Sequence, residues 1–387
     1  MKKIKIVHFI HSMGIGGAQV LVKDYALLLD KNKFDVTVLC VEREDTFLDH
    51  ILEESGIHTI YVSDYFPFRK FFFKIKIVNR ILLKTGIPKL FVKHFLRKIN
   101  PDILHFHLLC SSYIKVADLP QTCSLIHTIH SQPKKYWCVK QRFARNDFKA
   151  LNHLIHSRGV QLIALNQNAK DTANKLFNVN NTIVLNNAIN FDKFNVSETK
   201  AEIRNSLGIS NDTYLVGNIG RFFPVKNHTM IVKAFAILCK EKSNAHLLLV
   251  GDGEYRSQIE AEINQLNIND KVTILNARTD VPRLLKSLDV FIFPSIFEGL
   301  GIVLIEAQKM GIPCVISNAI PQEAVISNLV HRMENKATPT DYAKALTDIH
   351  INTIEYHDLE KWDMNVVIKQ LENIYIQIQQ QKEGACL

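Results

Sequence analysis

Apolar positions recur along the chain in two patterns. Short uninterrupted apolar runs bounded by turn residues are typical of buried parallel strands, whereas apolar residues three and four positions apart are typical of amphipathic helices. In the first half, the predicted strands are Ile4–Ile10, Asp35–Cys40, His58–Val62, Asp102–His107, Ser124–His130, Gln161–Asn166 and Thr182–Asn187. In the second half, they are Tyr214–Gly220, His246–Val250, Lys271–Leu275, Val290–Phe293 and Cys314–Ile316.

Predicted helices separate many of these strands. They include Val20–Leu29, Ser111–Ala117, a helix that opens at Lys226 and runs to Lys240, Ile302–Met310, Asp341–Ile351 and Asn365–Gln380. This alternation predicts an α/β fold with doubly wound parallel sheets. At 387 residues the chain is too long for one ordinary core. We therefore expect a first domain over 1–195, a second over 196–364, and a C-terminal helix over 365–387 that packs back on the first domain.

Composition narrows the class of protein. The chain is 47% hydrophobic and 22% charged, as in soluble globular proteins, and no apolar run reaches the ~20 residues that span a bilayer. The charged N-terminus precedes too short an apolar run for a signal peptide. Seven scattered cysteines with no C-x-x-C pair fit a reducing cytosol. The net charge of +9 suits nucleic acid, anionic lipid or phosphorylated substrates.

The segment from Phe66 to Lys98 holds ten Lys or Arg residues and no Asp or Glu, interleaved with large apolar residues. Such a segment is typical of an amphipathic element on an anionic membrane surface. The alternatives are a helix that packs on the core with its lysines solvated, and nucleic-acid binding, for which no recognition motif accompanies the charges. The predicted membrane-surface residues are Arg69, Lys70, Phe72, Phe73, Lys74, Lys76, Arg80 and Lys84.

A glycine-rich turn follows the first strand. Gly16 and Gly17 open the next helix, which permits three interpretations. A dinucleotide fingerprint requires a small residue where Gln19 stands and an acid that closes the second strand, whereas Glu42 lies beyond the predicted end of that strand. The other two are a tight turn alone and close approach of the backbone to a ligand.

A second glycine turn lies between the predicted strand Val290–Phe293 and the helix Ile302–Met310. Gly299 and Gly301 stand there at a helix N-terminus, where backbone N–H groups and the helix dipole favour an anion. Glu298 and Glu306 flank this turn. Since carboxylates accept hydrogen bonds, they suit sugar or ribose hydroxyls rather than phosphate.

Cations and histidines stand at other strand ends. Arg221 and Lys226 share one loop before a helix and suit a diphosphate, unless they are merely solvated surface cations. His130 ends its strand at the edge where ligands bind in open α/β sheets. We interpret His105, His107 and His127 as satisfied strand residues. With no carboxylate cluster nearby, we predict no metal site.

Taken in order, these motifs resemble retaining nucleotide-sugar glycosyltransferases of family 4, which have the GT-B fold. The resemblance implies two Rossmann-like doubly wound domains facing a central cleft. In the second half it rests on Gly220–Arg221, Lys226–Asn227, Val250–Gly253, Arg278–Val281, Pro294–Ser295, Glu298–Gly301, Glu306–Ala307 and Gly311–Pro313. In the first half it rests on Gly16–Ala18, Asp102–His105, His130 and Asn187–Asn190. The departures are Gln19, Asn276 and Asn187–Ala188, which replace a more usual Glu, Gly and Asn-Gly.

The resemblance also implies roles for individual residues. Arg221 and Lys226 would stabilise the leaving diphosphate, and Glu298 and His130 would face the donor sugar. Further donor contacts would come from both halves. They are Gly16 and Gly17 at the diphosphate, Gly299, Leu300 and Gly301 at the sugar and phosphate, Glu306 at the ribose, and Ala277 and Arg278 near the nucleobase, mostly through backbone.

The implied reaction moves a hexose-type sugar, with retention, from a nucleotide-sugar, UDP being favoured over GDP. The acceptor would be a saccharide or a polyprenyl-diphosphate-linked saccharide, in cell-surface polysaccharide synthesis. The protein would lie in the cytoplasm, peripherally on the inner membrane face. With no Asp-x-Asp element in the chain, protein cations take the metal's role, and no cofactor is expected. The alternatives are a GT-B-like epimerase or phosphorylase, a hydrolase using Glu298 and Glu306, and a non-catalytic binding subunit.

Overall fold

The computed structural model describes residues 2–14, 16–66, 86–130, 142–351 and 353–385. The chain forms two compact units, one of Met1–Ala188 with Lys361–Leu387 and the other of Ile189–Glu360. Each is described by itself. The unit boundaries fall after residues 188 and 360, where the sequence led us to expect 195 and 364.

The first unit is built on a seven-stranded sheet in the order β3-β2-β1-β4-β5-β6-β7. Every pairing in it is parallel. Because the order reverses between β1 and β4, the carboxyl ends of these two strands mark the point where ligands bind in such sheets. The strands are β1 (Ile4–Ser12), β2 (Phe34–Glu42), β3 (His58–Tyr61), β4 (Ile103–His107), β5 (Ser124–Ile129), β6 (Gln161–Ala164) and β7 (Ile183–Val184).

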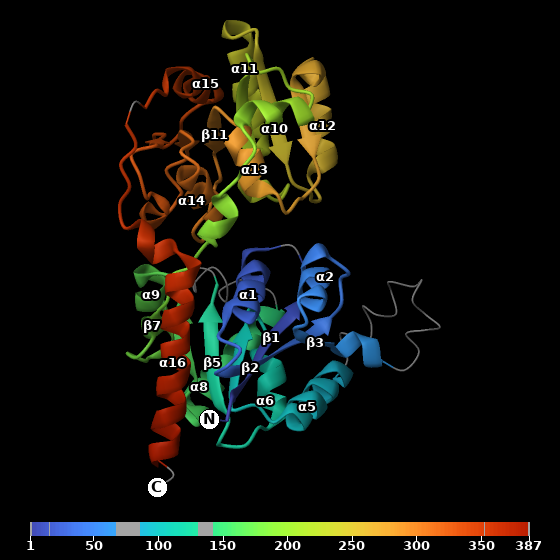
Figure 1. Cartoon of the computed structure of the whole chain (residues 1–387), viewed down its shortest axis with the longest axis vertical. Helices are drawn as coiled ribbons and strands as arrows, with labels where there is room; N and C mark the ends of the chain where they lie inside the picture. Colours follow the sequence, from blue (N-terminus) through green and yellow to red (C-terminus); the bar gives the residue numbers. More distant parts are fainter. Residues whose placement is uncertain (1, 15, 67–85, 131–141, 352, 386–387) are drawn as a thin grey trace. The chain divides into compact units, whose positions relative to one another are not determined.

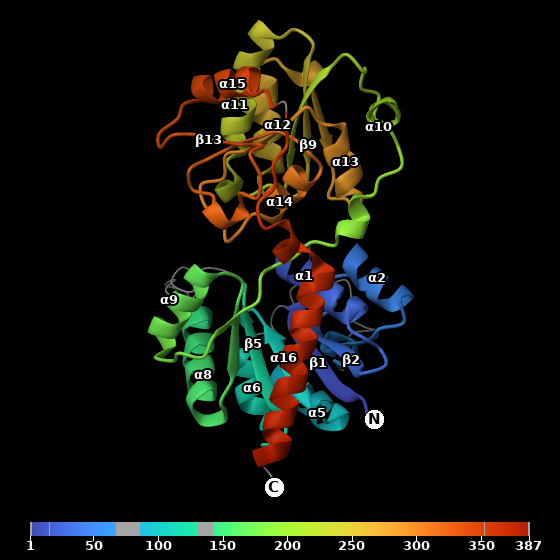
Figure 2. The same cartoon turned by 60° about the vertical axis from the view of Figure 1, so that its left-hand side comes forward.

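Helices cover both faces of this sheet (Figures 1 and 2). On one face, α5 (Ile87–Ile99), α6 (Ser111–Ala117), α8 (Arg142–Arg158) and α9 (Gln167–Phe177) form one apolar core with the strands. On the other face lie α1 (Gly17–Leu28), α2 (Phe47–Glu54) and the C-terminal α16 (Met364–Ala385). In α16 the side chains of Leu371 and Tyr375 are fully buried, so this helix is part of the core of the first unit.

The second unit repeats the arrangement. Its six parallel strands are ordered β10-β9-β8-β11-β12-β13, so the order reverses between β8 and β11. The strands are β8 (Tyr214–Ile219), β9 (Ala245–Val250), β10 (Val272–Leu275), β11 (Val290–Phe293), β12 (Cys314–Ile316) and β13 (Val330–Arg332). The helices are α10 (Lys200–Ser206), α11 (His228–Glu241), α12 (Arg256–Gln265), α13 (Val281–Ser287), α14 (Ile302–Lys309) and α15 (Pro339–Asp348).

The predicted fold class is confirmed, with local corrections. The strand predicted to end at Cys40 continues through Glu42, because Glu42 pairs with Ser12 of β1. The acid that we placed beyond the second strand therefore closes it, although Gln19 still departs from the dinucleotide pattern. The helix predicted to open at Lys226 begins at His228, because Asn227 has a left-handed backbone with φ of 56°. The elements that were missed are the short β13 and the helices α2, α8, α9, α10, α12 and α13.

The basic segment is only partly described. Its predicted membrane-surface residues, between Arg69 and Lys84, all lie outside the described residues. The helix α5, which follows, buries Val92 and Leu96 in the core and leaves Leu90 62% exposed. Packing on the core, one of our alternatives, therefore accounts for one side of α5. In the described part of the chain, no helix is long and apolar enough to cross a membrane.

Candidate active site

The carboxyl ends of β8 and β11 bring two loops of the second unit together. The loop after β8 contains a short 3-10 turn, Pro224–Lys226, and the loop after β11 leads into α14. The N–H of Ile296 donates to the Val225 carbonyl at 2.8 Å, and the Asn227 amide donates to the Pro294 carbonyl at 3.3 Å. These bonds hold the two loops side by side, because β8 and β11 are neighbours in the sheet.

Lys226 and Glu298 meet across these loops. The Lys226 ammonium donates to a Glu298 carboxylate oxygen at 2.6 Å and lies 5.1 Å from the centre of the Phe293 ring. Their side chains are 20% and 11% exposed, so the pair is mostly withdrawn from water. An ammonium has three donors, which leaves Lys226 able to bind a phosphate oxygen as well.

The glycine turn before α14 has the backbone that an anion site needs. Gly301 caps the helix with a left-handed φ of 88°, and a Cβ at this position would lie 3.0 Å from the Phe293 ring. Gly299 and Leu300 precede it, so their N–H groups lie at the helix N-terminus. Glu306 lies half-buried within α14, beyond the first turn.

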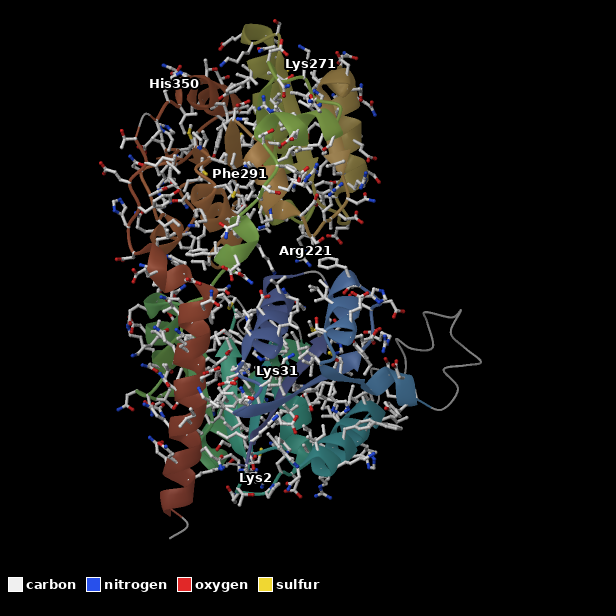
Figure 3. The ribbon with its side chains drawn as sticks, in the orientation of Figure 1. Lys2, Lys31, Arg221, Lys271, Phe291 and His350 are labelled. Atoms are coloured by element: carbon white, nitrogen blue, oxygen red, sulfur yellow. The ribbon has the colours of Figure 1, made fainter. Side chains whose placement is uncertain are left out.

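Arg221 follows β8 at the same edge of the sheet (Figure 3). Its side chain is exposed, and its guanidinium carbon lies 4.9 Å from the centre of the Phe223 ring. A second glycine turn, which follows β9 and contains Gly251 and Gly253, packs closely against this loop. A Cβ at Gly251 would lie 2.0 Å from the Gly220 carbonyl oxygen, and one at Gly253 would lie 2.3 Å from the Phe222 carbonyl oxygen. Only glycine allows this close approach.

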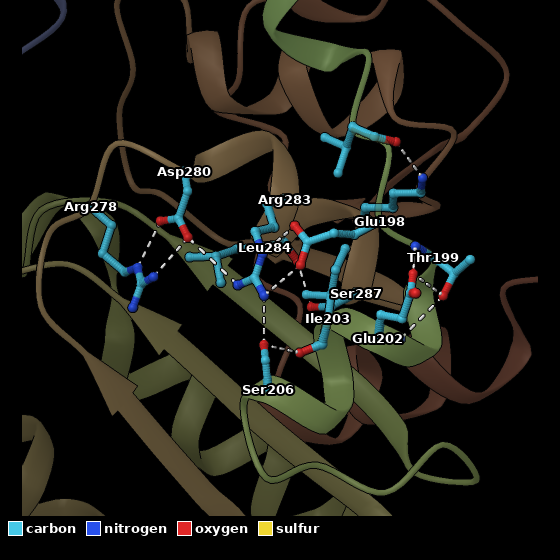
Figure 4. A network of polar contacts seen from close by, with 12 residues as sticks. Glu198, Thr199, Glu202, Ile203, Ser206, Arg278, Asp280, Arg283, Leu284 and Ser287 are labelled. Carbon is cyan, nitrogen blue, oxygen red and sulfur yellow. Dashed lines mark hydrogen bonds and ion pairs between the residues drawn. The ribbon is translucent and has the colours of Figure 1, made fainter.

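Arg278 belongs to a separate polar network (Figure 4). Its guanidinium donates twice to Asp280, at 2.7 Å each. Asp280 also faces Arg283 at 3.7 Å, and Arg283 donates to Glu198 at 2.7 and 3.0 Å. The bidentate pair with Asp280 occupies the Arg278 side chain. Ala277 lies half-buried in the loop after β10.

In the first unit, the glycine turn after β1 leaves room for polar side chains. Gly16 caps α1 with extended backbone, and a Cβ there would lie 2.6 Å from the Gln19 side-chain oxygen. A Cβ at Gly14 would lie 2.5 Å from a Glu44 carboxylate oxygen. The other Glu44 oxygen accepts from the Ser12 hydroxyl at 2.5 Å. Gly17 is the first residue of α1.

His130 follows β5 and is hydrogen-bonded to a second histidine. Its Nε2 lies 2.9 Å from Nδ1 of His107, whose Nε2 lies 3.2 Å from Nδ1 of His8. Burial, with a smaller contribution from His127, lowers the pKa of His130 to about 3. Burial lowers the pKa of His8 to about 3 as well, and that of His107 well below its ordinary value. The rings are therefore neutral at physiological pH.

Three of the histidines satisfy the spacing of a metal site. Ring nitrogens of His8, His105 and His107 lie within 4.8 Å of one another. Both nitrogens of His105 are already engaged, Nδ1 with the Tyr375 hydroxyl at 2.6 Å and Nε2 with the Thr128 hydroxyl at 2.7 Å. His107 uses both of its nitrogens too. A cation would have to break these bonds, so we interpret the cluster as a hydrogen-bonded polar core.

The structure thus brings together Lys226 and Glu298, with Arg221 and Gly299–Gly301 on the same loops, and commits the Arg278 side chain elsewhere. Sequence reasoning named Asn227 only as part of the Lys226–Asn227 motif and gave it no role, whereas the structure shows its amide donating to the Pro294 carbonyl. It also did not single out His8. A lone polar residue within the apolar run Ile4–Ile10 was the available signal, because a buried polar group needs a partner.

The comparisons with known proteins identify the family of the chain. Two family models match adjoining parts of the chain, Glycosyltransferase Family 4 over residues 15–193 and Glycosyl transferases group 1 over residues 199–362. The fold and the two matches define a glycosyltransferase with the GT-B fold. The chain belongs to glycosyltransferase family 4, as the motifs led us to expect.

Similar proteins act on bacterial glycans. The chain is 26% identical, over 84% of its length and 82% of the relative's, to the UDP-Gal:alpha-D-GlcNAc-diphosphoundecaprenol alpha-1,3-galactosyltransferase of Escherichia coli. It is also 26% identical, over 96% of its length and 99% of the relative's, to the capsular polysaccharide biosynthesis glycosyltransferase CapH of Staphylococcus aureus.

Solved structures share the fold at lower identity. Anabaena HepE, crystallised with UDP and glucose, superposes with a TM-score of 0.71 at 18% identity, covering 98% of this chain and 99% of HepE. WaaG, a glycosyltransferase involved in lipopolysaccharide biosynthesis, superposes with a TM-score of 0.68 at 16% identity, covering 89% and 90%.

Proposed function

We propose that this glycosyltransferase moves a hexose-type sugar, with retention, from a UDP-sugar to a saccharide carried on a polyprenyl diphosphate. The product would extend a cell-surface polysaccharide such as a capsule, an exopolysaccharide or an O-antigen. The support for the donor is the cation site described above together with HepE, which was crystallised with UDP. The support for the acceptor is the E. coli relative, whose name specifies a diphosphoundecaprenol-linked sugar.

The contact between Lys226 and Glu298 carries the proposal, because it joins the two chemistries that sugar transfer needs. Breaking the bond between sugar and phosphate builds negative charge on the leaving diphosphate. Lys226, Arg221 and the N–H groups of Gly299–Gly301 supply positive charge at one sheet edge. Glu298 lies 2.6 Å from the Lys226 ammonium, so the group that accepts from sugar hydroxyls lies beside the cation that holds the phosphate.

The remaining donor contacts follow the family pattern. Glu306 binds the ribose hydroxyls, and Ala277 with Arg278 lies near the nucleobase through backbone. From the first unit, Gly16 and Gly17 approach the diphosphate and His130 faces the sugar. The cations of the protein take the place of a metal ion.

The acceptor brings the protein to a membrane surface. A polyprenyl diphosphate is held in the lipid bilayer, so an enzyme acting on it gains from residence at that surface. The basic segment that ends in α5 would supply attraction to anionic lipid. We therefore propose a peripheral location on the inner face of the cytoplasmic membrane.

A donor panel tests the proposal. The purified full-length chain is given UDP- and GDP-sugars with and without a membrane extract, and the release of nucleotide is measured. We expect UDP release that depends on the extract, and a product whose new linkage has the anomeric configuration of the donor. Release of free sugar without any acceptor would favour a hydrolase, and interconversion of donors without release would favour an epimerase.

A further inference from the structure

The hydrogen-bonded histidines of the first unit form a chain that ends at the ligand-binding edge of the sheet. His8 lies in β1, His107 ends β4, and His130 follows β5. Since β1, β4 and β5 are consecutive neighbours in the sheet, the three rings step across it. The nitrogen-to-nitrogen distances are 3.2 Å between His8 and His107 and 2.9 Å between His107 and His130. His8 and His107 are fully buried, and the ring of His130 makes no other hydrogen bond within the described part of the chain.

A chain of neutral imidazoles has only two arrangements of its protons. Each neutral ring carries one N–H and one bare nitrogen, so each can donate once and accept once. If His107 donates from Nδ1 to His130, then its Nε2 must accept from Nδ1 of His8. If His107 instead accepts at Nδ1, then His130 donates from Nε2 and His107 donates from Nε2 to His8. The proton on His130 is thus coupled to the proton on His8, two strands away.

The outer nitrogen of His8, at the end of the histidine series away from His130, decides between the two arrangements. Nε2 of His8 is buried and has no hydrogen-bond partner among the described residues. In the first arrangement this nitrogen is a bare lone pair, and in the second it is an N–H group with no acceptor. A buried N–H group without a partner is the rarer and more costly case. The first arrangement is therefore favoured, and in it His130 carries its proton on Nδ1.

We propose that His8 and His107 are positioning residues that hold His130 in its Nδ1–H tautomer, so that His130 donates a hydrogen bond to an oxygen atom of the donor sugar. This inference rests on the proposed function in one respect, namely that His130 faces the sugar. A neutral donor suits this place, because it binds a hydroxyl or ring oxygen without adding positive charge beside the forming positive sugar ring.

The side chains around His8, His107 and His130 do not join their hydrogen-bonded series. The ring of His105 stacks on His107 with centroids 4.3 Å apart, but its own hydrogen bonds go to Tyr375 and Thr128. Tyr25 lies 5.9 Å from the His8 ring, and Tyr375 lies 6.4 Å from it, centre to centre. His127 faces away into the Phe106 carbonyl, at 3.1 Å. Each of these neighbours is neutral or a hydrogen-bond partner of another group.

Nitrogen NMR of the histidine rings tests the proposal on the full-length protein without ligand. The two ring nitrogens have different chemical shifts in each tautomer, so they report where the proton lies. We expect His130 of the unsubstituted protein to show one tautomer, protonated at Nδ1. Substitutions His8→Phe and His107→Phe keep an aromatic ring and remove the coupling, and His130 should then show both tautomers.

The steady-state kinetics of the same variants provide a second test. We expect kcat to fall about tenfold in His107→Phe and less in His8→Phe, with KM changed less than twofold, because about one oriented hydrogen bond is lost from the transition state. His8→Asn places an amide N–H near the position of Nδ1 and should restore both the tautomer and the rate. The matched control is His127→Phe, which alters a buried histidine of the same sheet outside the chain and should leave the His130 tautomer unchanged.

Three results would overturn the inference. They are an unsubstituted His130 with both tautomers or a proton on Nε2, an unchanged His130 spectrum in His8→Phe and His107→Phe, and an equal change in His127→Phe. The first needs no variant, so a variant that fails to fold does not prevent the test. A separate result, full transfer by His130→Ala, would refute the placement of His130 at the sugar and leave the tautomer measurement valid.

Discussion

The two units place different kinds of polar group at equivalent edges of their sheets, charged side chains in the second unit and neutral histidine rings in the first. Both sheets reverse their strand order beside the first strand of the unit, and both put polar groups at the carboxyl ends there. In the second unit, these groups are charged and stand on loops, as with Lys226 and Glu298. In the first unit, they are neutral rings on strand ends, as with His107 and His130.

The difference in burial explains why the groups are charged in one unit and neutral in the other. Charged groups retain their charge where loops keep part of the side chain in water, and where a partner compensates the rest. A strand interior offers neither, so burial lowers the pKa of the histidines and they remain as neutral hydrogen-bonding groups. The same fold thus supplies fixed charge in one unit and directed hydrogen bonds in the other.

The largest expected effect is that acid destabilises the first unit more than the second. Burial lowers the pKa of His8 and His127 to about 3. Between about pH 6.5 and 3 the unfolded chain therefore binds more protons than the folded one, and stability falls as the pH falls, by about 1 kcal/mol per pH unit for each ring. His105 and His107 add to this in the same direction.

The second unit should resist acid longer, because fewer of its histidines lose stability in acid: burial lowers the pKa of His228 to about 4 and lowers that of His246. Burial of Asp289 alone would raise its pKa, but bonds and charges from Lys200, the Leu215 N–H and Arg204 outweigh it and hold the pKa below its ordinary value. Its contribution to stability is lost only below about pH 4. Urea unfolding at pH 7.5, 6.0 and 5.0, followed by a hydrogen-exchange pulse at one fixed pH, would resolve the units by mass spectrometry. Earlier unfolding of the second unit would contradict the comparison.

Removing the cation of the second unit should affect catalysis next most strongly. Lys226→Ala takes away charge at the proposed leaving group, so we expect kcat/KM to fall about 10²–10³-fold with the fold intact. The matched control is Lys233→Ala, because Lys233 also pairs with a glutamate, Glu262 at 3.5 Å, with its side chain 50% exposed. The release of UDP and the circular dichroism of both variants give the measurement. Near-normal turnover of Lys226→Ala would count against the whole donor site.

A smaller effect is expected from the glycine that caps α14. Gly301→Ala puts a Cβ on a left-handed backbone and 3.0 Å from Phe293, so we expect a loss of roughly 1–3 kcal/mol in the free energy of unfolding. Gly56→Ala in the first unit has the same strain, with φ of 71°, but nothing within 4 Å of the new Cβ. It should lose only about 1 kcal/mol. Urea midpoints give both values, and equal losses would show that the Phe293 contact is immaterial.

The smallest effect should come from a chelator. Because His105 and His107 use both ring nitrogens for hydrogen bonds, we expect neither the rate nor the unfolding midpoint to change in excess EDTA. Metal analysis of the purified protein accompanies the assay. One equivalent of zinc or nickel that leaves with loss of stability would make the histidine cluster of the first unit a metal site.

Most of the fold was predictable, because it depends on local signals. Apolar runs such as Val290–Phe293 were identified within a residue or two, and the glycine before α14 marked its start. Boundaries set by pairing were missed. β2 extends to Glu42 only because β1 offers Ser12 as a partner, and α11 begins at His228 only because Asn227 turns left-handed.

The sequence by itself determined the succession of the strands apart from β13, the glycine turns, and the residue types at each strand end. These depend on periodicity and backbone preference over a few residues. Only the tertiary structure decided which of them meet. Lys226 and Glu298 are 72 positions apart, and His8 and His107 are 99 apart, so their contacts exist only through the pairing of non-consecutive strands. Strand order is a property of the whole sheet, and no local pattern encodes it.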